Sequence, residues 1–222
     1  MNVNTPTPVD SPTRPPATDP PPHLVIGIAG GSASGKSSLS HRLAHGLGPH
    51  HCAVIAHDRY YRDHPNLTAA ERQQLDYDHP GAIETALLLR HLRALRAGQA
   101  IQLPHYDYAR HCRTTEATPL QHAPVIIIEG LFVLADPHLR RVLDLKIFVH
   151  TPDDLRLLRR IKRDTTERGQ PLAEVLERYE NRVRPGHIRH VAPSRRHADL
   201  VWDQGNDDTF PARLLNRLRQ TP

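Results

Sequence analysis

The stretch from Gly30 to Ser37 constrains the fold more than any other part of the sequence. It reads Gly-Gly-Ser-Ala-Ser-Gly-Lys-Ser and matches the pattern G-x-x-x-x-G-K-[ST] in full. The apolar run Leu24–Ala29 precedes it, and leucines at every fourth position follow it, so it joins a predicted buried strand to a predicted helix. Glycines let backbone N–H groups turn inward around a phosphate, and the helix N-terminus adds positive potential. The sequence therefore predicts a phosphate-binding loop.

A loop of this kind assigns a role to each of its polar side chains. Lys36 is predicted to reach the β- and γ-phosphates of a nucleotide, and the Ser37 hydroxyl to hold Mg²⁺. ATP is the expected phosphate donor, with GTP as a second donor. The predicted nucleotide-binding residues are Gly30, Gly31, Ser32, Ala33, Ser34, Gly35, Lys36, Ser37 and Ser38.

Predicted strands and helices alternate along the rest of the chain. Further strands are predicted at Ala53–Ala56, Val125–Ile128, Leu145–Val149 and Asp199–Trp202. Helices are expected after the capping-box pair Thr68 and Glu71, over Ile83–Ala97, after Thr151 as an N-cap, and at the C-terminus. This order predicts an α/β P-loop NTPase fold of three layers, with a parallel sheet of about five strands flanked by helices.

A proline-rich N-terminal segment and one insertion define the domain organisation. Residues 1–22 are expected to form a disordered tail, because they contain eight prolines and almost no apolar side chains. Residues 23–222 are expected to form a single domain. Residues 101–120 have no helical period and contain two prolines, so they are predicted to be an inserted β-hairpin that binds the substrate.

Composition weakens several other interpretations. The net charge is +5, but acidic residues are interspersed among the 26 arginines and three lysines, so nucleic-acid binding is not expected. No apolar stretch is long enough to span a bilayer, and membrane association is not expected. Cys52 and Cys112 form no metal-binding pair, and a cytoplasmic location is the default.

Two acidic residues follow predicted strands, at the edge where ligands bind open α/β sheets. Asp58 comes just after the predicted strand Ala53–Ala56, and Glu129 comes directly after the predicted strand Val125–Ile128. A carboxylate at this edge can accept the proton of an attacking hydroxyl and help to hold Mg²⁺. A helix-capping role for Asp58 remains an equal alternative when that residue is considered alone. The absence of an [NT]-K-x-D motif argues against a GTPase.

An arginine-rich segment, residues 156–170, is predicted to be a helical lid over the nucleotide. Arg156, Arg159, Arg160 and Arg163 recur at helical spacing on one face, and Arg168 follows. Such a cluster can neutralise a transferring phosphoryl group and exclude water. Leu155, Leu158 and Ile161 are expected to occupy the neighbouring face and to dock the helix. The alternative is a solvated helix neutralised by Asp153, Asp154 and Asp164.

Together these features resemble the uridine kinase (uridine–cytidine kinase) family of P-loop kinases, from about Ile26 to Asp199. The resemblance rests on the phosphate-binding loop, Asp58-Arg59-Tyr60-Tyr61, Tyr77-Asp78-His79-Pro80, Pro104-His105-Tyr106-Asp107-Tyr108, Ile128-Glu129-Gly130 and the two lid motifs that contain Arg163 and Arg168. It implies ATP-dependent phosphorylation of the 5′-hydroxyl of uridine and of cytidine, and a homo-oligomer, a tetramer in this family.

The resemblance also implies roles for particular residues. The implied catalytic residues are Asp58, Lys36, Arg163 and Arg168, and the implied Mg²⁺ ligands are Ser37, Asp58 and Glu129. The implied substrate-binding residues are Asp58, Tyr61, Asp78, Tyr106, His111, Arg160, Gln170 and Arg178. Asp78 would bind the ribose hydroxyls, and His111 would serve O4 of uracil or N4 of cytosine.

Three positions depart from the family pattern. The usual arginine after the lid is Gln170, the usual glutamine before a tyrosine is Arg178, and the usual glutamine before the catalytic aspartate is His57. At positions 170 and 178 a guanidinium and an amide have therefore exchanged places. If both side chains face one pocket, each change compensates for the other; if they do not, recognition of the base is altered. Two alternative functions remain: a sibling kinase similar to phosphoribulokinase or pantothenate kinase, and a non-catalytic basic module that binds nucleic acid.

Overall fold

A five-stranded parallel sheet forms the centre of the protein, for which the computed structural model describes residues 24–220. The tail predicted for residues 1–22 lies outside the described residues. The strands are β1 (Leu24–Gly30), β2 (Cys52–Ala56), β5 (Val125–Gly130), β6 (Leu145–His150) and β7 (Leu200–Asp203), in the spatial order β2-β5-β1-β6-β7. The predicted α/β architecture and its five strands are confirmed.

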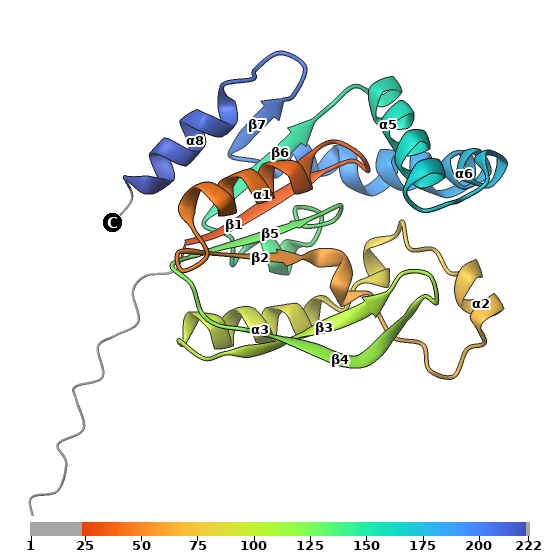
Figure 1. Ribbon diagram of the computed structural model, residues 1–222, viewed down its shortest axis with the longest axis horizontal. Helices are drawn as coiled ribbons and strands as arrows, with labels where there is room; N and C mark the ends of the chain where they lie inside the picture. The colour runs from red at the N-terminus through yellow and green to blue at the C-terminus, as the bar shows by residue number, and fades with distance from the viewer. Residues whose placement is uncertain (1–23, 221–222) are drawn as a thin grey trace, which may run out of the picture.

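Helices and a hairpin cover the two faces of this sheet (Figure 1). On one face, α1 (Lys36–Leu47) and α8 (Phe210–Arg219) bury Leu39, Leu43 and Leu214 against β1, β5 and β6. On the other face, α3 (Thr85–Arg96) packs Leu88, Leu92 and Leu95 beside the hairpin. The leucine spacing in each helix matches its buried side, so the amphipathic pattern explains why these helices dock where they do.

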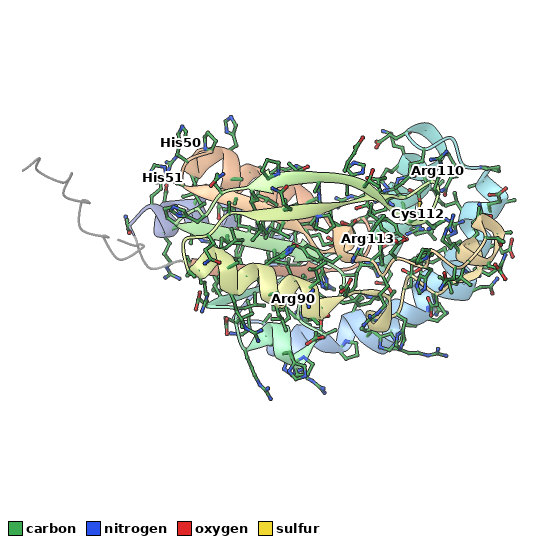
Figure 2. All side chains as sticks on the ribbon, turned by 90° about the horizontal axis from the view of Figure 1, so that it is seen from below. His50, His51, Arg90, Arg110, Cys112 and Arg113 are labelled. Atoms are coloured by element: carbon green, nitrogen blue, oxygen red, sulfur yellow. The ribbon has the colours of Figure 1, made fainter. Side chains whose placement is uncertain are left out.

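The predicted insertion is a two-stranded antiparallel hairpin of β3 (Ile101–Asp107) and β4 (Cys112–Leu120). Its pairing register shifts between Pro104 and Tyr106, which is expected because proline has no N–H for the ladder. Figure 2 labels Arg110, Cys112 and Arg113 near the turn of the hairpin, at the end of the molecule away from His50 and His51, which precede β2. The turn therefore lies near the carboxyl ends of the parallel strands.

Shorter helices complete the chain between and after these elements. Short turns at His57–Tyr60 and Pro80–Ala82 flank α2 (Ala69–Gln74), and α4 (Pro137–Arg140) precedes β6. The α2 helix starts at Thr68 with the predicted capping box, in which Thr68 and Glu71 exchange hydrogen bonds. The lid prediction corresponds to α5 (Asp153–Thr166) and the loop that follows it.

One helical stretch, residues 172–197, was not predicted from the sequence. It comprises α6 (Leu172–Arg178), a wide turn at Tyr179–Val183, α7 (Arg184–Gly186), a second wide turn at His187–Val191 and a tight turn at Ala192–His197. Two prolines, Pro185 and Pro193, and the lack of a regular leucine repeat hide it in the sequence. Helices containing such wide turns are frequent near functional sites.

Two expectations about α5 are wrong. Leu155 and Leu158 do not dock the helix: their exposed fractions are 38% and 63%, whereas Arg156 and Asp164 are buried. Thr151 does not cap the helix, because its hydroxyl donates to the Ser34 carbonyl oxygen at 3.0 Å and Pro152 occupies the cap position. Within residues 24–220, no helix has the length and apolar character needed to cross a membrane.

Candidate active site

A cavity of about 590 Å³ lies between the phosphate-binding loop, the hairpin turn and the lid. It brings together residues that are far apart in the sequence. The predicted residues that line it are Ser32, Lys36, Ser37, Asp58, Tyr61, Asp78, Tyr106, His111, Glu129, Arg160, Arg163, Arg168, Gln170 and Arg178. The loop residues Gly30, Gly31, Ala33, Ser34, Gly35 and Ser38 lie beside it without lining it.

The phosphate-binding loop is held in shape by close contacts that exclude side chains. Gly35 caps α1 with a φ of 91°, a left-handed conformation that favours glycine. At Gly31, a Cβ would lie only 2.5 Å from Nη1 of Arg156. The loop closes through a hydrogen bond from the Ser34 N–H to the Gly31 carbonyl oxygen at 3.1 Å. Backbone conformation therefore favours glycine at position 35, and the Arg156 side chain packs closely against Gly31.

Four polar side chains meet at the start of α1. The Ser37 hydroxyl donates to Oε1 of Glu129 at 3.0 Å, which joins the loop to the end of β5. Burial lowers the pKa of Lys36, although the negative charges of Glu129 and Asp58 oppose this shift. Burial raises the pKa of Glu129, and the nearby charge of Asp58 adds to the rise. The group combines one cation, two carboxylates and a hydroxyl.

This group fits a magnesium ion bound with a nucleotide. Oδ1 of Asp58 and Oε2 of Glu129 are both buried without a hydrogen-bond partner, and each offers a free oxygen of the kind that Mg²⁺ prefers. Among residues 24–220, no cluster of three His, Cys, Asp or Glu side chains forms a complete protein cage for a metal. Mg²⁺ ordinarily uses one or two carboxylates together with phosphate oxygens, so the donor set matches that chemistry.

Asp164 organises the lid arginines. This carboxylate is fully buried and forms ion pairs with Arg160 at 3.2 Å, Arg163 at 2.9 Å and Arg168 at 3.3 Å. Arg160 also donates to the Ser32 hydroxyl at 3.0 Å, which ties the lid to the phosphate-binding loop. One carboxylate leaves these guanidinium groups with excess positive charge, as an anion-binding site requires. Sequence reasoning treated Asp164 only as a neutralising surface charge.

The predicted four-arginine face is divided between two surroundings. Arg160 and Arg163 line the cavity, but Arg156 and Arg159 do not. Arg156 is buried and donates to the Thr151 carbonyl oxygen at 3.2 Å and to Asp153 at 2.6 Å. Arg159 donates instead to the Gln204 side chain. The prediction that all four face the phosphoryl group is therefore wrong for Arg156 and Arg159.

Aromatic rings form the hairpin side of the cavity. Tyr61 lies against Tyr77 and Tyr106, with ring centroids 5.1 and 5.3 Å apart, and Tyr77 stacks on His111 at 4.7 Å. The hydroxyls of Tyr77 and Tyr106 are buried close to each other, with no well-aligned hydrogen bond to the protein. Flat rings with polar tips are well suited to bind a flat heterocycle that carries its own donors and acceptors.

Asp78 lies between this aromatic group and the lid. Burial raises its pKa, while the positive charges of Arg160 and Arg178 oppose the rise. The backbone around it packs closely against α7, since a Cβ at Gly186 would lie 2.5 Å from the Asp78 carbonyl oxygen. Asp78 thus offers the cavity a carboxylate with two acceptor oxygens, as recognition of a diol would need.

Gln170 and Arg178 line the same cavity. Gln170 is tied to the lid through its N–H, which donates to the Asp164 carbonyl oxygen at 2.9 Å. The charge of Arg178 acts on His111 and Asp78. The two positions therefore share one pocket, which is the condition stated above for a compensating exchange.

Sequence reasoning missed several lining residues, including Tyr77, Arg182, Gln73 and Phe132. Tyr77 was visible as part of the Tyr77-Asp78-His79-Pro80 segment but received no role. Arg182 comes from the unpredicted helical stretch and carries no sequence signal of its own.

Comparison with known proteins decides the family. A family model described as "Phosphoribulokinase / Uridine kinase family" matches residues 25–210. The chain belongs to the phosphoribulokinase/uridine kinase family. Among the most similar relatives is a protein of this family named uridine kinase from Staphylococcus carnosus, 45% identical over 83% of this chain and 88% of the relative. Another, named uridine kinase from Proteus mirabilis, is 46% identical over 86% of this chain and 92% of the relative.

Solved structures agree on the family fold. A phosphoribulokinase from Rhodobacter spheroides superposes with a TM-score of 0.60 at 18% identity, over 82% of this chain and 70% of that one. A possible uridine kinase from Bacillus stearothermophilus superposes with a TM-score of 0.55 at 22% identity, over 84% and 92%. At these identities the likeness shows the P-loop kinase fold alone. Membership in this kinase family implies that the chain uses a nucleotide as phosphate donor.

Proposed function

We propose that the protein is a uridine kinase that transfers the γ-phosphoryl group of ATP to the 5′-hydroxyl of uridine, with cytidine as a secondary substrate. The single observation that carries this proposal is the shared cavity, in which Lys36 and Ser37 face Asp58 and an aromatic wall lies beside them. Relatives named uridine kinase, 42 to 46% identical over most of this chain, support it.

The reaction follows from the positions of the side chains. Asp58 accepts the proton of the 5′-hydroxyl, the freed oxygen attacks the γ-phosphorus, and the bond to the bridging oxygen breaks to release ADP. Lys36, Arg163 and Arg168 neutralise the charge that spreads over the transferring group. Mg²⁺, held by Ser37, Asp58 and Glu129 together with phosphate oxygens, would neutralise further charge there.

The nucleoside is held by the other half of the cavity. Asp78 accepts hydrogen bonds from the ribose hydroxyls, with Arg160 between the lid and the substrate. Tyr61, Tyr106 and His111 surround the base. The aromatic wall favours a flat base over the second phosphate of a sugar phosphate, which argues against a phosphoribulokinase-like substrate.

The decisive experiment measures ADP release with uridine, cytidine, ribulose 5-phosphate and pantothenate. We expect turnover with uridine, and an Asp58→Asn variant that binds ATP normally but loses about 10²- to 10⁴-fold in kcat. Asp154→Asn, an exposed aspartate on α5, is the matched control and should keep full activity. Turnover with a sugar phosphate but with no nucleoside would contradict the proposal, as would near-normal rates in Asp58→Asn.

Three further parts of the proposal rest on the family resemblance or on composition. We propose a homo-oligomer, a tetramer, which light scattering of the purified protein would test. We place the protein in the cytoplasm, without membrane or nucleic-acid partners. A basic nucleic-acid-binding module would instead bind any oligonucleotide with steep salt dependence and would show no nucleoside-stimulated ATP turnover.

A further inference from the structure

The short turn that carries Asp58 is fastened to the start of α3. The Tyr60 carbonyl oxygen accepts the Glu84 N–H at 2.8 Å, and the Arg62 N–H donates to the Ala82 carbonyl oxygen at 2.8 Å. An isolated antiparallel bridge lies between these two contacts. The backbone just after Asp58 is therefore held by the segment that opens α3, and α3 itself is anchored in the core by its leucines.

The Glu84 side chain does not cap the helix at whose start it lies. Glu84 is the N-cap residue of α3, yet its carboxylate accepts no hydrogen bond from the backbone of residues 85–96. Its Oε2 instead forms an ion pair with Nη1 of Arg113 at 2.7 Å, and the two side chains are 28% and 18% exposed. A side-chain oxygen at an N-cap position ordinarily accepts a bond from the helix backbone, so the ion pair takes the place of that bond.

Arg113 belongs to the hairpin and joins it to both of these segments. It lies on β4 opposite Tyr106 of β3, which lines the cavity. Besides its ion pair with Glu84, its Nη2 donates to the Tyr60 carbonyl oxygen at 3.4 Å, and its N–H donates to the Asp63 side chain at 3.2 Å. One guanidinium therefore meets the start of α3 and the turn after β2 at the same time.

The other strand of the hairpin touches the same turn more weakly. Arg59 donates to the Pro104 carbonyl oxygen of β3 at 3.5 Å, which is long for a hydrogen bond. Figure 1 shows the hairpin running beside the turn that follows β2. The charged pair of Arg113 and Glu84 at 2.7 Å is the shorter and stronger contact. The position of the hairpin relative to Asp58 thus depends chiefly on Arg113.

We propose that Arg113 is a positioning residue for phosphoryl transfer, an inference that rests on the proposed nucleoside kinase activity. The hairpin holds the nucleoside in that proposal, and Asp58 accepts the proton of its 5′-hydroxyl. The pair of Arg113 and Glu84 fixes the hairpin to the turn that carries Asp58, although neither member of the pair lines the cavity. A displacement of about 1 Å between reacting groups can cost about 10²-fold in rate, so this pair sets kcat from outside the cavity.

The test measures kcat, KM for uridine and KM for ATP in three variants. Arg113→Lys keeps the charge but replaces a fork of two nitrogens with one ammonium, and Arg113→Gln removes the charge as well. Glu84→Gln keeps the arginine and every backbone contact and weakens only the ion pair. We expect kcat to fall about tenfold in Arg113→Lys and Glu84→Gln and about 10²-fold in Arg113→Gln. KM for uridine should rise severalfold, and KM for ATP should stay unchanged because the phosphate-binding loop and the lid are untouched.

Arg96→Lys is the matched control. Nη2 of Arg96 donates to Asp144 at 2.8 Å and to the Val142 carbonyl oxygen at 3.0 Å, so the same substitution disturbs the same kind of contact with a carboxylate and a carbonyl. Asp144 directly precedes β6, and none of these three residues lines the cavity. Arg96→Lys should therefore leave kcat and both KM values unchanged.

The outcomes separate the positioning role from the kinase proposal. A normal kcat in folded Arg113→Lys and Glu84→Gln would overturn the positioning role and leave the kinase proposal standing. An equal loss of kcat in Arg96→Lys, or a rise in KM for ATP as large as that for uridine, would overturn it too, because the effect would not be confined to the hairpin and the turn. Absence of turnover with any nucleoside in the wild type would overturn both proposals. Thermal unfolding checks that each variant is folded, and Glu84→Gln decides the question if the Arg113 variants do not fold.

Discussion

Replacing His57 with glutamine should make the protein less sensitive to acid. His57 follows β2 at the edge of the cavity and has an exposed fraction of 2%, and its Nε2 is buried without a partner. Burial lowers its pKa from 6.5 to about 4, although the charge of Asp136 opposes the shift. The folded protein therefore keeps this imidazole neutral where the unfolded chain would protonate it.

The sign and size of the effect follow from proton linkage. As the pH falls from 6.5 toward 4, the unfolded state binds a proton that the folded state does not, so the free energy of unfolding decreases. A shift of about 2.5 pKa units amounts to about 3.4 kcal/mol, lost in full below pH 4. Between pH 7 and pH 5 the expected loss from this one residue is about 1.8 kcal/mol.

Urea unfolding at pH 7 and pH 5 measures this loss directly. His57→Gln removes the titrating ring but keeps a polar side chain of similar size, so its free energy of unfolding should fall by about 1.8 kcal/mol less than that of the wild type over the same interval. Other groups that titrate there, including His187, whose pKa is also lowered to about 4, contribute equally to both proteins and cancel. Equal pH dependence in the two proteins would refute the reasoning.

Three further substitutions test the loop and the lid. Asp164→Asn leaves three arginines without their shared buried carboxylate and should cost about 3–5 kcal/mol in urea unfolding; a loss below 1 kcal/mol would contradict the assigned role. Gly35→Ala forces a side chain into a φ of 91° and should cost about 1–2 kcal/mol and raise KM for ATP. Arg156→Met keeps the bulk beside Gly31 but loses the hydrogen bond to Thr151, so KM for ATP should rise severalfold with KM for uridine unchanged. Equal changes in both KM values would argue against a local effect on the loop.

The fold was predictable because its signals are local. The strand before Gly30, the loop itself and the leucine repeat of α1 all occur within one short segment and fix the first strand–loop–helix unit. The buried strands read as continuous apolar runs, as parallel strands covered on both faces do. The cavity residues were largely identified too, because each follows a strand or lies in a recognisable segment.

The errors arose where side-chain direction matters more than spacing. Helical periodicity places Arg156, Arg159, Arg160 and Arg163 on one side of α5, and the helix docks through that side. Arg156 therefore bonds to Thr151 and Arg159 to Gln204, whereas Arg160 and Arg163 line the cavity. Spacing alone gives no reason for leucines at 155 and 158 to face solvent. The buried Asp164 and Arg156 account for it, because the carboxylate pairs with three arginines and Arg156 donates to Thr151, so the polar side of the helix faces inward.

The unsatisfied polar atoms of the protein connect its stability to its chemistry. Within residues 24–220, the buried side-chain atoms that lack a partner include Asp58 Oδ1, Glu129 Oε2 and the hydroxyls of Tyr77 and Tyr106, all from residues that line the cavity. Each such atom ordinarily costs about 1–3 kcal/mol. A fold that only needed to be stable would pair them or replace them with apolar groups. Their concentration in one cavity is best explained if a ligand supplies the missing partners there.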